Sequence, residues 1–151
     1  MALQFFSDIV TGFTYAGLYV WSGQTAANTI TLFGGTQPTA AQVVASWATY
    51  SAQYLVHWTS VSKAVPNGDL FSFATPAAKA AFRSGTGTWA IWWPGAVTDA
   101  AVQGSTLPRT DFCILPASES GGNGCFRMTS LAITSGTSYQ PSDIAIKMGF
   151  V

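Results

Sequence analysis

The sequence contains one histidine, His57, and a Ser–His–Asp arrangement needs that imidazole as its base. Serines and aspartates are available as partners, but there is no G-x-S-x-G turn, and Ser46, Ser51 and Ser60 have no distinguishing neighbours. His57 itself lies in the apolar run 55–58. We therefore interpret it as a strand histidine, hydrogen-bonded inside or at the rim of the core, and predict no catalytic residue.

Glycoside hydrolysis would need two carboxyl groups that face each other across a cleft. Asp111 and Glu119 flank one loop and could approach each other, but Glu119 lies between Ser118 and Ser120, a context typical of solvent. One histidine and scattered acids offer no cluster of metal ligands. Residues 85–87 lack the following lysine and helix of a phosphate-binding loop. The sequence thus predicts no metal and no cofactor.

The two cysteines, Cys113 and Cys125, are twelve positions apart, a spacing that fits neither a zinc motif nor a redox C-x-x-C pair. Two interpretations stay open. Both residues are free thiols in a reducing cytosol, or they form a disulfide across the ends of the loop 116–124. The disulfide requires two strands that place the Cα atoms within about 6 Å of each other.

Three tryptophans, Trp89, Trp92 and Trp93, lie on one predicted strand, with Trp92 pointing to the face opposite the other two. Both faces of that strand are therefore aromatic. One interpretation is a central strand buried on both sides. The other is a partner interface, in which one face stacks on a sugar or receives another subunit.

The local pattern predicts a mainly β protein. Strands are expected at 29–33, 54–58, 70–73, 88–93, 112–115, 125–134 and 143–150. A helix capped by Thr36 or Thr39 is expected over 38–51, and residues 76–82 could add one or two helical turns. The glycine-rich run 121–124 is predicted to be the tip of a hairpin. The predicted fold is a β-sandwich or barrel of short antiparallel strands with one helix inserted near residues 38–51.

The first 28 residues form an aromatic segment that precedes this single β-rich domain, residues 29–151. Phe5, Phe6 and Phe13 make the segment too apolar for water, while Gly12 and Gly17 make it a poor continuous helix. The segment either packs on its own core as an edge strand or reaches out as an arm to a neighbouring subunit. The second alternative makes these three phenylalanines part of a partner interface.

Charge is scarce, with six basic and six acidic residues in a chain of 151, or 8%, against roughly 25% in ordinary domains. Six cationic side chains cannot build the stripe that neutralises a phosphate backbone, which argues against nucleic-acid binding. No run approaches the ~18 apolar residues of a membrane span, and the first residues lack the basic start of a signal peptide. A neutral surface of this kind suits a subunit of a homo-oligomer or larger assembly.

Three short patterns carry a resemblance. Residues 30–38 form a strand that ends in a G-T-x-P turn, residues 87–92 form a G-T strand with tryptophans, and a C-terminal block contains Ser130, Ile133, Gly136, Ile146 and Met148. Together they resemble small structural proteins of tailed bacteriophages over most of residues 29–150. The aromatic N-terminal segment lies outside this resemblance.

The resemblance implies a non-enzymatic virion protein, made in the host cytoplasm, whose partners are the major capsid protein or neighbouring virion subunits. The leading hypothesis is a capsid decoration (cement) protein. A tail, baseplate or fibre component is the first alternative. A carbohydrate-binding module that uses an exposed tryptophan is the second.

Overall fold

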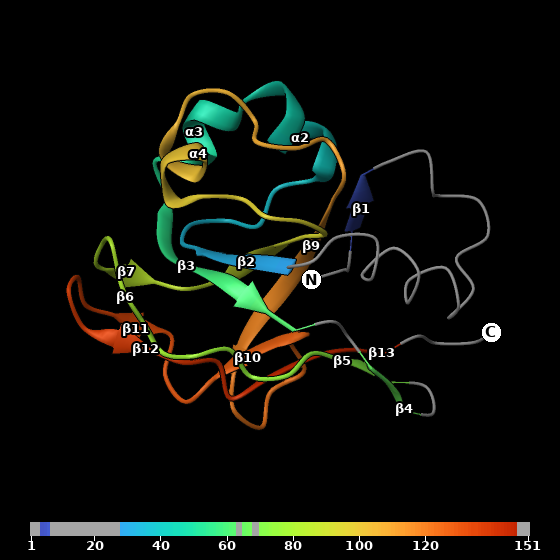
Figure 1. The fold of residues 1–151 in the computed structure, drawn as a ribbon. Coiled ribbons are helices and arrows are strands. Elements are labelled where there is room, and N and C mark those ends of the chain that lie inside the picture. The colour runs from blue at the N-terminus through green and yellow to red at the C-terminus, as the bar shows by residue number, and fades with distance from the viewer. Residues whose placement is uncertain (1–3, 7–27, 63–64, 68–69, 148–151) are drawn as a thin grey trace.

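The computed structural model describes residues 4–6, 28–62, 65–67 and 70–147 of the chain, with side chains described for 28–62 and 72–146. The protein is mainly β, as predicted, and its main sheet is curled. Among the described residues there are three short helices, and Figure 1 shows them above a first group of strands, with a second group of strands below. The helices, the first group and the second group form three layers.

Nine strands form the main sheet, in the order β3-β2-β8-β9-β10-β13-β5-β4, with β1 paired to β9 outside this path. Their bounds are β1 Gln4–Phe6, β2 Asn28–Phe33, β3 Tyr54–Val61, β4 Val65–Asn67, β5 Leu70–Ser72, β8 Trp89–Trp93, β9 Phe112–Glu119, β10 Phe126–Met128 and β13 Asp143–Lys147. Two small ladders add β6 Lys79–Ala80 with β12 Ser138–Tyr139, and β7 Gly85–Thr86 with β11 Ala132–Ile133.

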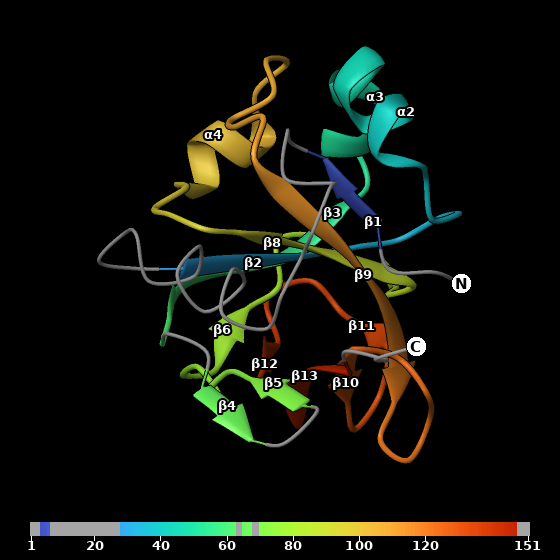
Figure 2. The ribbon, with the colours of Figure 1, turned by 90° about the vertical axis from the view of Figure 1, so that its right-hand side faces the viewer.

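Strand β9 joins the upper and lower groups of strands, and it crosses the molecule diagonally in Figure 2. Residues 113–116 pair with β8. Residues 112–114 pair with β1, so residues 113 and 114 have a partner strand on each side, and residues 117–119 pair with β10. The sheet therefore divides along β9, which allows the lower strands to fold beneath the upper ones.

Two apolar clusters fill the spaces between the three layers. The first lies between the upper and lower strands, and its largest members are Trp58, Trp92, Phe73 and Phe126. The second lies between the upper strands and the helices, and its aromatic members include Phe33, Trp47, Trp89, Trp93 and Phe112. Since β2 and β8 contribute to both clusters, they are central strands buried on both faces.

The predicted helix is present as two shorter ones, α2 (Ala40–Ala45) and α3 (Trp47–Ser51). Thr39 caps α2, and its hydroxyl accepts from the backbone N–H of Gln42 while the Gln42 side chain accepts from the N–H of Thr39. The break falls at Ser46, whose φ of −141° is not helical. A third helix, α4 (Asp99–Gln103), was not predicted.

Several local predictions are wrong. Residues 76–82 form no helical turn, because Lys79 and Ala80 pair with β12. The expected strand 125–134 is divided into β10 and β11, which belong to different sheets. All the described strand pairs are antiparallel except β9–β10, so the run 121–124 is no hairpin tip. The run instead brings the chain back beside β9, so that β10 pairs parallel to it. Gly124 passes so close to β9 that a Cβ there would lie 2.7 Å from the backbone nitrogen of Ser118.

Candidate functional site

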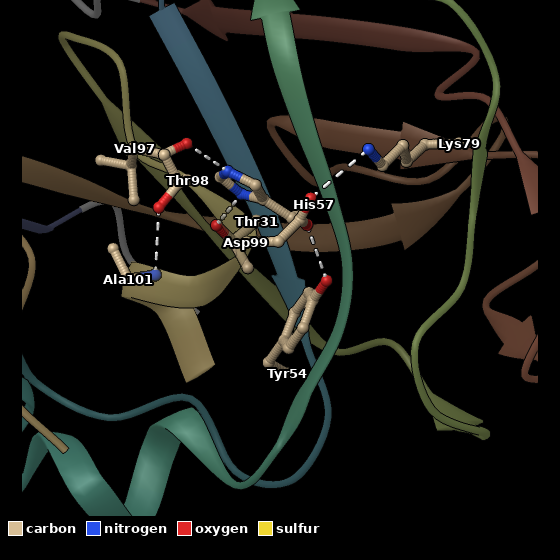
Figure 3. Close-up of polar contacts among 8 residues, drawn as sticks. All are labelled: Thr31, Tyr54, His57, Lys79, Val97, Thr98, Asp99 and Ala101. Carbon is tan, nitrogen blue, oxygen red and sulfur yellow. Dashed lines mark hydrogen bonds and ion pairs between the residues drawn. The ribbon is translucent and has the colours of Figure 1, made fainter. Parts of the chain in front are cut away.

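His57, the one histidine, lies at the centre of a buried polar network between β2, β3 and the loop that leads into α4 (Figure 3). Antiparallel pairing places Thr31 of β2 directly opposite His57 of β3. The Oγ1 atom of Thr31 lies 2.7 Å from Nδ1 of the ring. On the other side of the ring, Nε2 lies 2.7 Å from the carbonyl oxygen of Val97.

The partners fix the tautomer of the imidazole. A carbonyl oxygen only accepts, so Nε2 carries the hydrogen and donates it to Val97. Neutral Nδ1 then accepts from the hydroxyl of Thr31, and that hydroxyl oxygen accepts from the indole Nε1 of Trp93 at 2.9 Å. The hydrogen bonds run in one direction, from Trp93 through Thr31 and His57 to Val97, and every member has a partner.

This network attaches α4 to the sheet. Val97 immediately precedes Thr98, which caps α4 by accepting from the N–H of Ala101 at 3.2 Å. A second buried bond, from the hydroxyl of Thr29 to the carbonyl of Gly95 at 3.0 Å, holds the same loop to β2. The loop is therefore fixed at both Gly95 and Val97 before the helix begins.

Asp99, the first residue of α4, makes a further link outside the buried network. Its carboxylate accepts from the hydroxyl of Tyr54 at 3.0 Å and forms an ion pair with Lys79 at 3.4 Å. Burial, reinforced by the charge of Asp99, raises the pKa of the Tyr54 phenol well above its usual value. The phenol of Tyr54 is therefore protonated at physiological pH and can donate to Asp99.

Burial also decides the charge of His57. The side chain is fully buried, and removal from water lowers the pKa of the imidazole. The hydrogen bond to Val97 and the charge of Asp99 act in the opposite direction, while the charge of Lys79 adds to the effect of burial. His57 is therefore neutral in the folded protein near pH 7.

A hydroxyl that donates to a neutral imidazole is also the geometry of an activated nucleophile. Here Thr31 and His57 both have 0% of their surface exposed, and Trp93 donates to the hydroxyl oxygen that would have to attack. A substrate therefore has no access to this oxygen in the structure. The arrangement supports the interpretation of His57 as a hydrogen-bonded core residue.

The two acids considered as a pair have different partners. Asp111 receives a bidentate bond from Arg109, with distances of 2.9 and 2.7 Å. Glu119 accepts from the backbone N–H of Leu131 at 3.4 Å. Within the described ranges, no three His, Cys, Asp or Glu side chains are grouped as a metal site would require. No helix among the described residues is long and apolar enough to cross a membrane.

Of the two interpretations of the cysteines, the structure has the first, because both are free thiols, and the alternative of a disulfide is wrong. The reason lies in the register of β9 and β10. Phe126 pairs with Ala117, which places Cys125 near the level of Pro116, three residues along β9 from Cys113. At about 3.3 Å per residue, this separates the two Cα atoms by roughly 10 Å, beyond the reach of a disulfide. Burial raises the pKa of both thiols.

The tryptophans of β8 divide between the two core clusters, as the alternation predicted, with Trp92 on one face and Trp89 and Trp93 on the other. All three are fully buried. Trp89 stacks on Phe33 with ring centroids 4.3 Å apart, and Trp92 meets Phe73 edge to face at 4.8 Å. The predicted partner interface at these tryptophans is therefore wrong, because none of them presents a face to a sugar or a subunit.

Phe5 and Phe6 belong to β1, where they are the Cα partners of Cys113 and Phe112 on β9. This short stretch of the N-terminal segment thus pairs with the protein's own sheet, which is the edge-strand alternative. Phe13 lies outside the described residues, as does most of the segment, so the arm remains a prediction for that part of the chain.

The sequence analysis did not predict that Thr31, Trp93 and Val97 form a network with His57, nor that Asp99 pairs with Tyr54. No local pattern marks them, because each is brought to His57 or Tyr54 by long-range pairing of strands. Comparison of the chain with protein-family models, with curated proteins and with solved structures finds no match. The functional proposal below therefore depends on the chain's own residues and on the resemblance of its short patterns to phage structural proteins.

Proposed function

We propose that this protein is a non-enzymatic structural subunit of a tailed-phage particle, most simply a decoration protein that binds the capsid shell. The observation that carries the proposal is the internal pairing of charge. Among the described side chains, four are cationic and four are anionic. Three ion pairs join Lys79 to Asp99, Arg109 to Asp111 and Arg127 to Asp143.

The remaining two charged groups of the described part also have protein partners. Arg83 donates to the backbone carbonyls of Ser51 and Ala52, at 3.1 and 2.7 Å, and Glu119 accepts from Leu131. A protein that must stay apart from its copies normally carries unpaired surface charge of one sign. Pairing of this kind removes the repulsion between copies, which suits a subunit that packs closely with many neighbours.

The buried network supports the same role. It attaches a helix and its loop to the sheet through hydrogen bonds whose donors and acceptors are all matched. A virion subunit gains from a rigid fold of this kind, because it must present one fixed surface at every position of a lattice. The glycan-binding alternative loses its basis at the tryptophans, since all three are buried.

Binding to particles tests the proposal. Tailed-phage particles assembled without the protein would be mixed with increasing amounts of the purified chain and sedimented. We expect binding that saturates at a fixed number of copies per capsid and that changes little between about 50 and 500 mM NaCl, because paired charges contribute little to docking. Saturation at a few copies per particle would indicate the tail, baseplate or fibre instead. No co-sedimentation at all would overturn the structural role.

A further inference from the structure

The connection between β9 and β10 contains an Asn-Gly pair, Asn123–Gly124. An asparagine followed by glycine is prone to deamidation, because glycine has no side chain to keep its backbone nitrogen away from the asparagine amide. The chain has two other asparagines. Asn28 is buried and precedes a threonine, while Asn67 precedes Gly68, which lies outside the described residues. The pair at 123 and 124 is therefore the one that the structure describes completely.

The surroundings of Asn123 leave room for this reaction. Its side chain is exposed, and a hollow of about 240 Å³ lies beside the pair, lined by residues 116–118, 123 and 124. Gly122, on the other side of Asn123, has no side chain to cover it. The reacting asparagine must turn its amide carbon toward the next backbone nitrogen, and water must reach the product. An exposed side chain beside a hollow meets both requirements.

One hydrogen bond opposes the reaction. The backbone N–H of Gly124 donates to Oγ of Ser118 on β9 at 2.9 Å, so the nitrogen that would attack is already engaged. This bond must break before the nitrogen can lose its proton. The loop also fits closely around Ser118, because a Cβ on Gly122 would lie 2.8 Å from Oγ and a Cβ on Gly124 would lie 2.7 Å from the backbone nitrogen. The fold thus restrains the pair without covering it.

We propose that Asn123–Gly124 is a site of slow self-modification, at which Asn123 deamidates at a rate that Ser118 limits. The nitrogen of Gly124 gives its proton to water and bonds to Cγ of Asn123, and the C–N bond of the side-chain amide breaks to release ammonia. Water then opens the five-membered succinimide ring at either carbonyl carbon. The products are aspartate and isoaspartate, so the overall change is asparagine plus water to acid plus ammonia.

The modification would change both charge and backbone. The chain has six basic and six acidic residues, and the reaction adds one carboxylate. Arg127, on the adjacent β10, already pairs with Asp143. Isoaspartate also lengthens the main chain by one carbon atom. Since Gly124 lies so close to β9, this product should displace it and weaken the pairing of β9 with β10. The inference does not depend on the proposed structural role.

Incubation of the full chain at about pH 8 and 37 °C, followed by peptide mapping with mass spectrometry, tests the site. We expect Asn123 to convert to aspartate and isoaspartate, while buried Asn28 stays intact. In guanidinium chloride Asn123 should react at least about fivefold faster, because unfolding removes a hydrogen bond of ordinary net strength. Conversion only in the unfolded chain would overturn the site. Equal rates in the two states would overturn the limiting role of Ser118.

Two serine variants distinguish the hydrogen bond from the loop as a whole. Ser118→Ala removes the acceptor and should raise the rate in the folded protein about fivefold. Ser120→Ala removes a hydroxyl of the same loop that instead bonds to Ser142 at 2.9 Å, and it should leave the rate unchanged. Equal acceleration by both variants would refute the role of Ser118. If Ser118→Ala does not fold, hydrogen exchange of the Gly124 amide in the unaltered protein decides, and an unprotected amide would refute that role.

Discussion

His57 of β3 and Thr31 of β2 face each other across an antiparallel pair, and the Nδ1 atom of His57 accepts the hydroxyl hydrogen of Thr31 over 2.7 Å. Through this contact, the indole N–H of Trp93 is linked to the carbonyl of Val97 at the start of the α4 region. The chain's only histidine therefore stabilises the attachment of a helix to a sheet. Its effect should appear in folding measurements.

Stability should depend on pH through His57. Burial lowers the pKa of His57 in the folded state below its unfolded value of about 6.5, so the unfolded chain binds the proton more readily. The contribution of neutral His57 to the free energy of unfolding is fully present above about pH 7. It is lost as the pH falls through 6.5 toward the folded pKa. Through this residue, the free energy of unfolding can change by up to about 1.4 kcal/mol per pH unit. Urea denaturation between pH 7.5 and 5.5 measures it.

The matched variant for this prediction is His57→Gln, which retains one donor and one acceptor. We expect a loss of about 1 kcal/mol at pH 7.5 and unchanged binding to particles. The free energy of unfolding of the variant should also lack the pH dependence that His57 contributes between pH 7.5 and 5.5. The same pH dependence in the two proteins would contradict this account of His57. Loss of a hydrolytic activity in the variant would contradict the non-enzymatic role.

The stability of the protein should depend more on the hydroxyl of Thr31 than on its methyl group. Thr31→Val leaves the Trp93 N–H and the His57 Nδ1 buried without partners, and we expect a loss of about 2–3 kcal/mol. Thr31→Ser keeps the oxygen and should cost less than about 1 kcal/mol. Free energies of unfolding from urea titrations compare the two variants. Equal costs would show that the hydroxyl contributes nothing.

The thiols should remain reduced, and they should react at different rates. Cys113 is fully buried and Cys125 is partly buried, so iodoacetamide should label Cys125 first in the native protein. Both should react after unfolding, and a reductant should leave the melting temperature unchanged. An intact mass that increases on reduction would reveal the disulfide that the strand register excludes.

Removal of β1 should expose an edge of β9. Without residues 1–6, the backbone of residues 112–114 loses its partner strand, and we expect lower stability and more aggregation. Deletion of residues 1–3 alone leaves β1 in place and serves as the control. Thermal melting and light scattering compare the two proteins. Unchanged stability combined with lost particle binding would instead favour the arm.

Much of the local structure could be predicted, because it depends on neighbours in the sequence. The patterns of residues 29–33 and 88–93 predicted strands, a central strand was one interpretation of the second, and Thr39 was one of the two predicted caps. The third helix could not be predicted, since α4 has only five residues and is held in place by the bond between His57 and Val97. For the same reason, Lys79 and Ala80 became a strand, because β12 offered them a partner.

The candidate site was less predictable than the fold. That His57 is a buried strand residue followed from the apolar run around it, but its two partners, Thr31 and Val97, are 26 and 40 positions away and are brought to the ring only by the fold. The surroundings of Arg83 have the same origin. Only the folded chain shows that the other described cations have aspartate partners and that this arginine faces a cleft.

Cryo-electron microscopy of the particles that contain this protein tests the central claim most directly. The account predicts density for the three-layered fold at regular positions on the outer surface of the capsid shell, with close contacts between the subunit and its neighbours. Density for the fold on the tail, baseplate or fibre would place the subunit elsewhere in the virion. Particles with a complete density map and no such subunit would contradict the structural role.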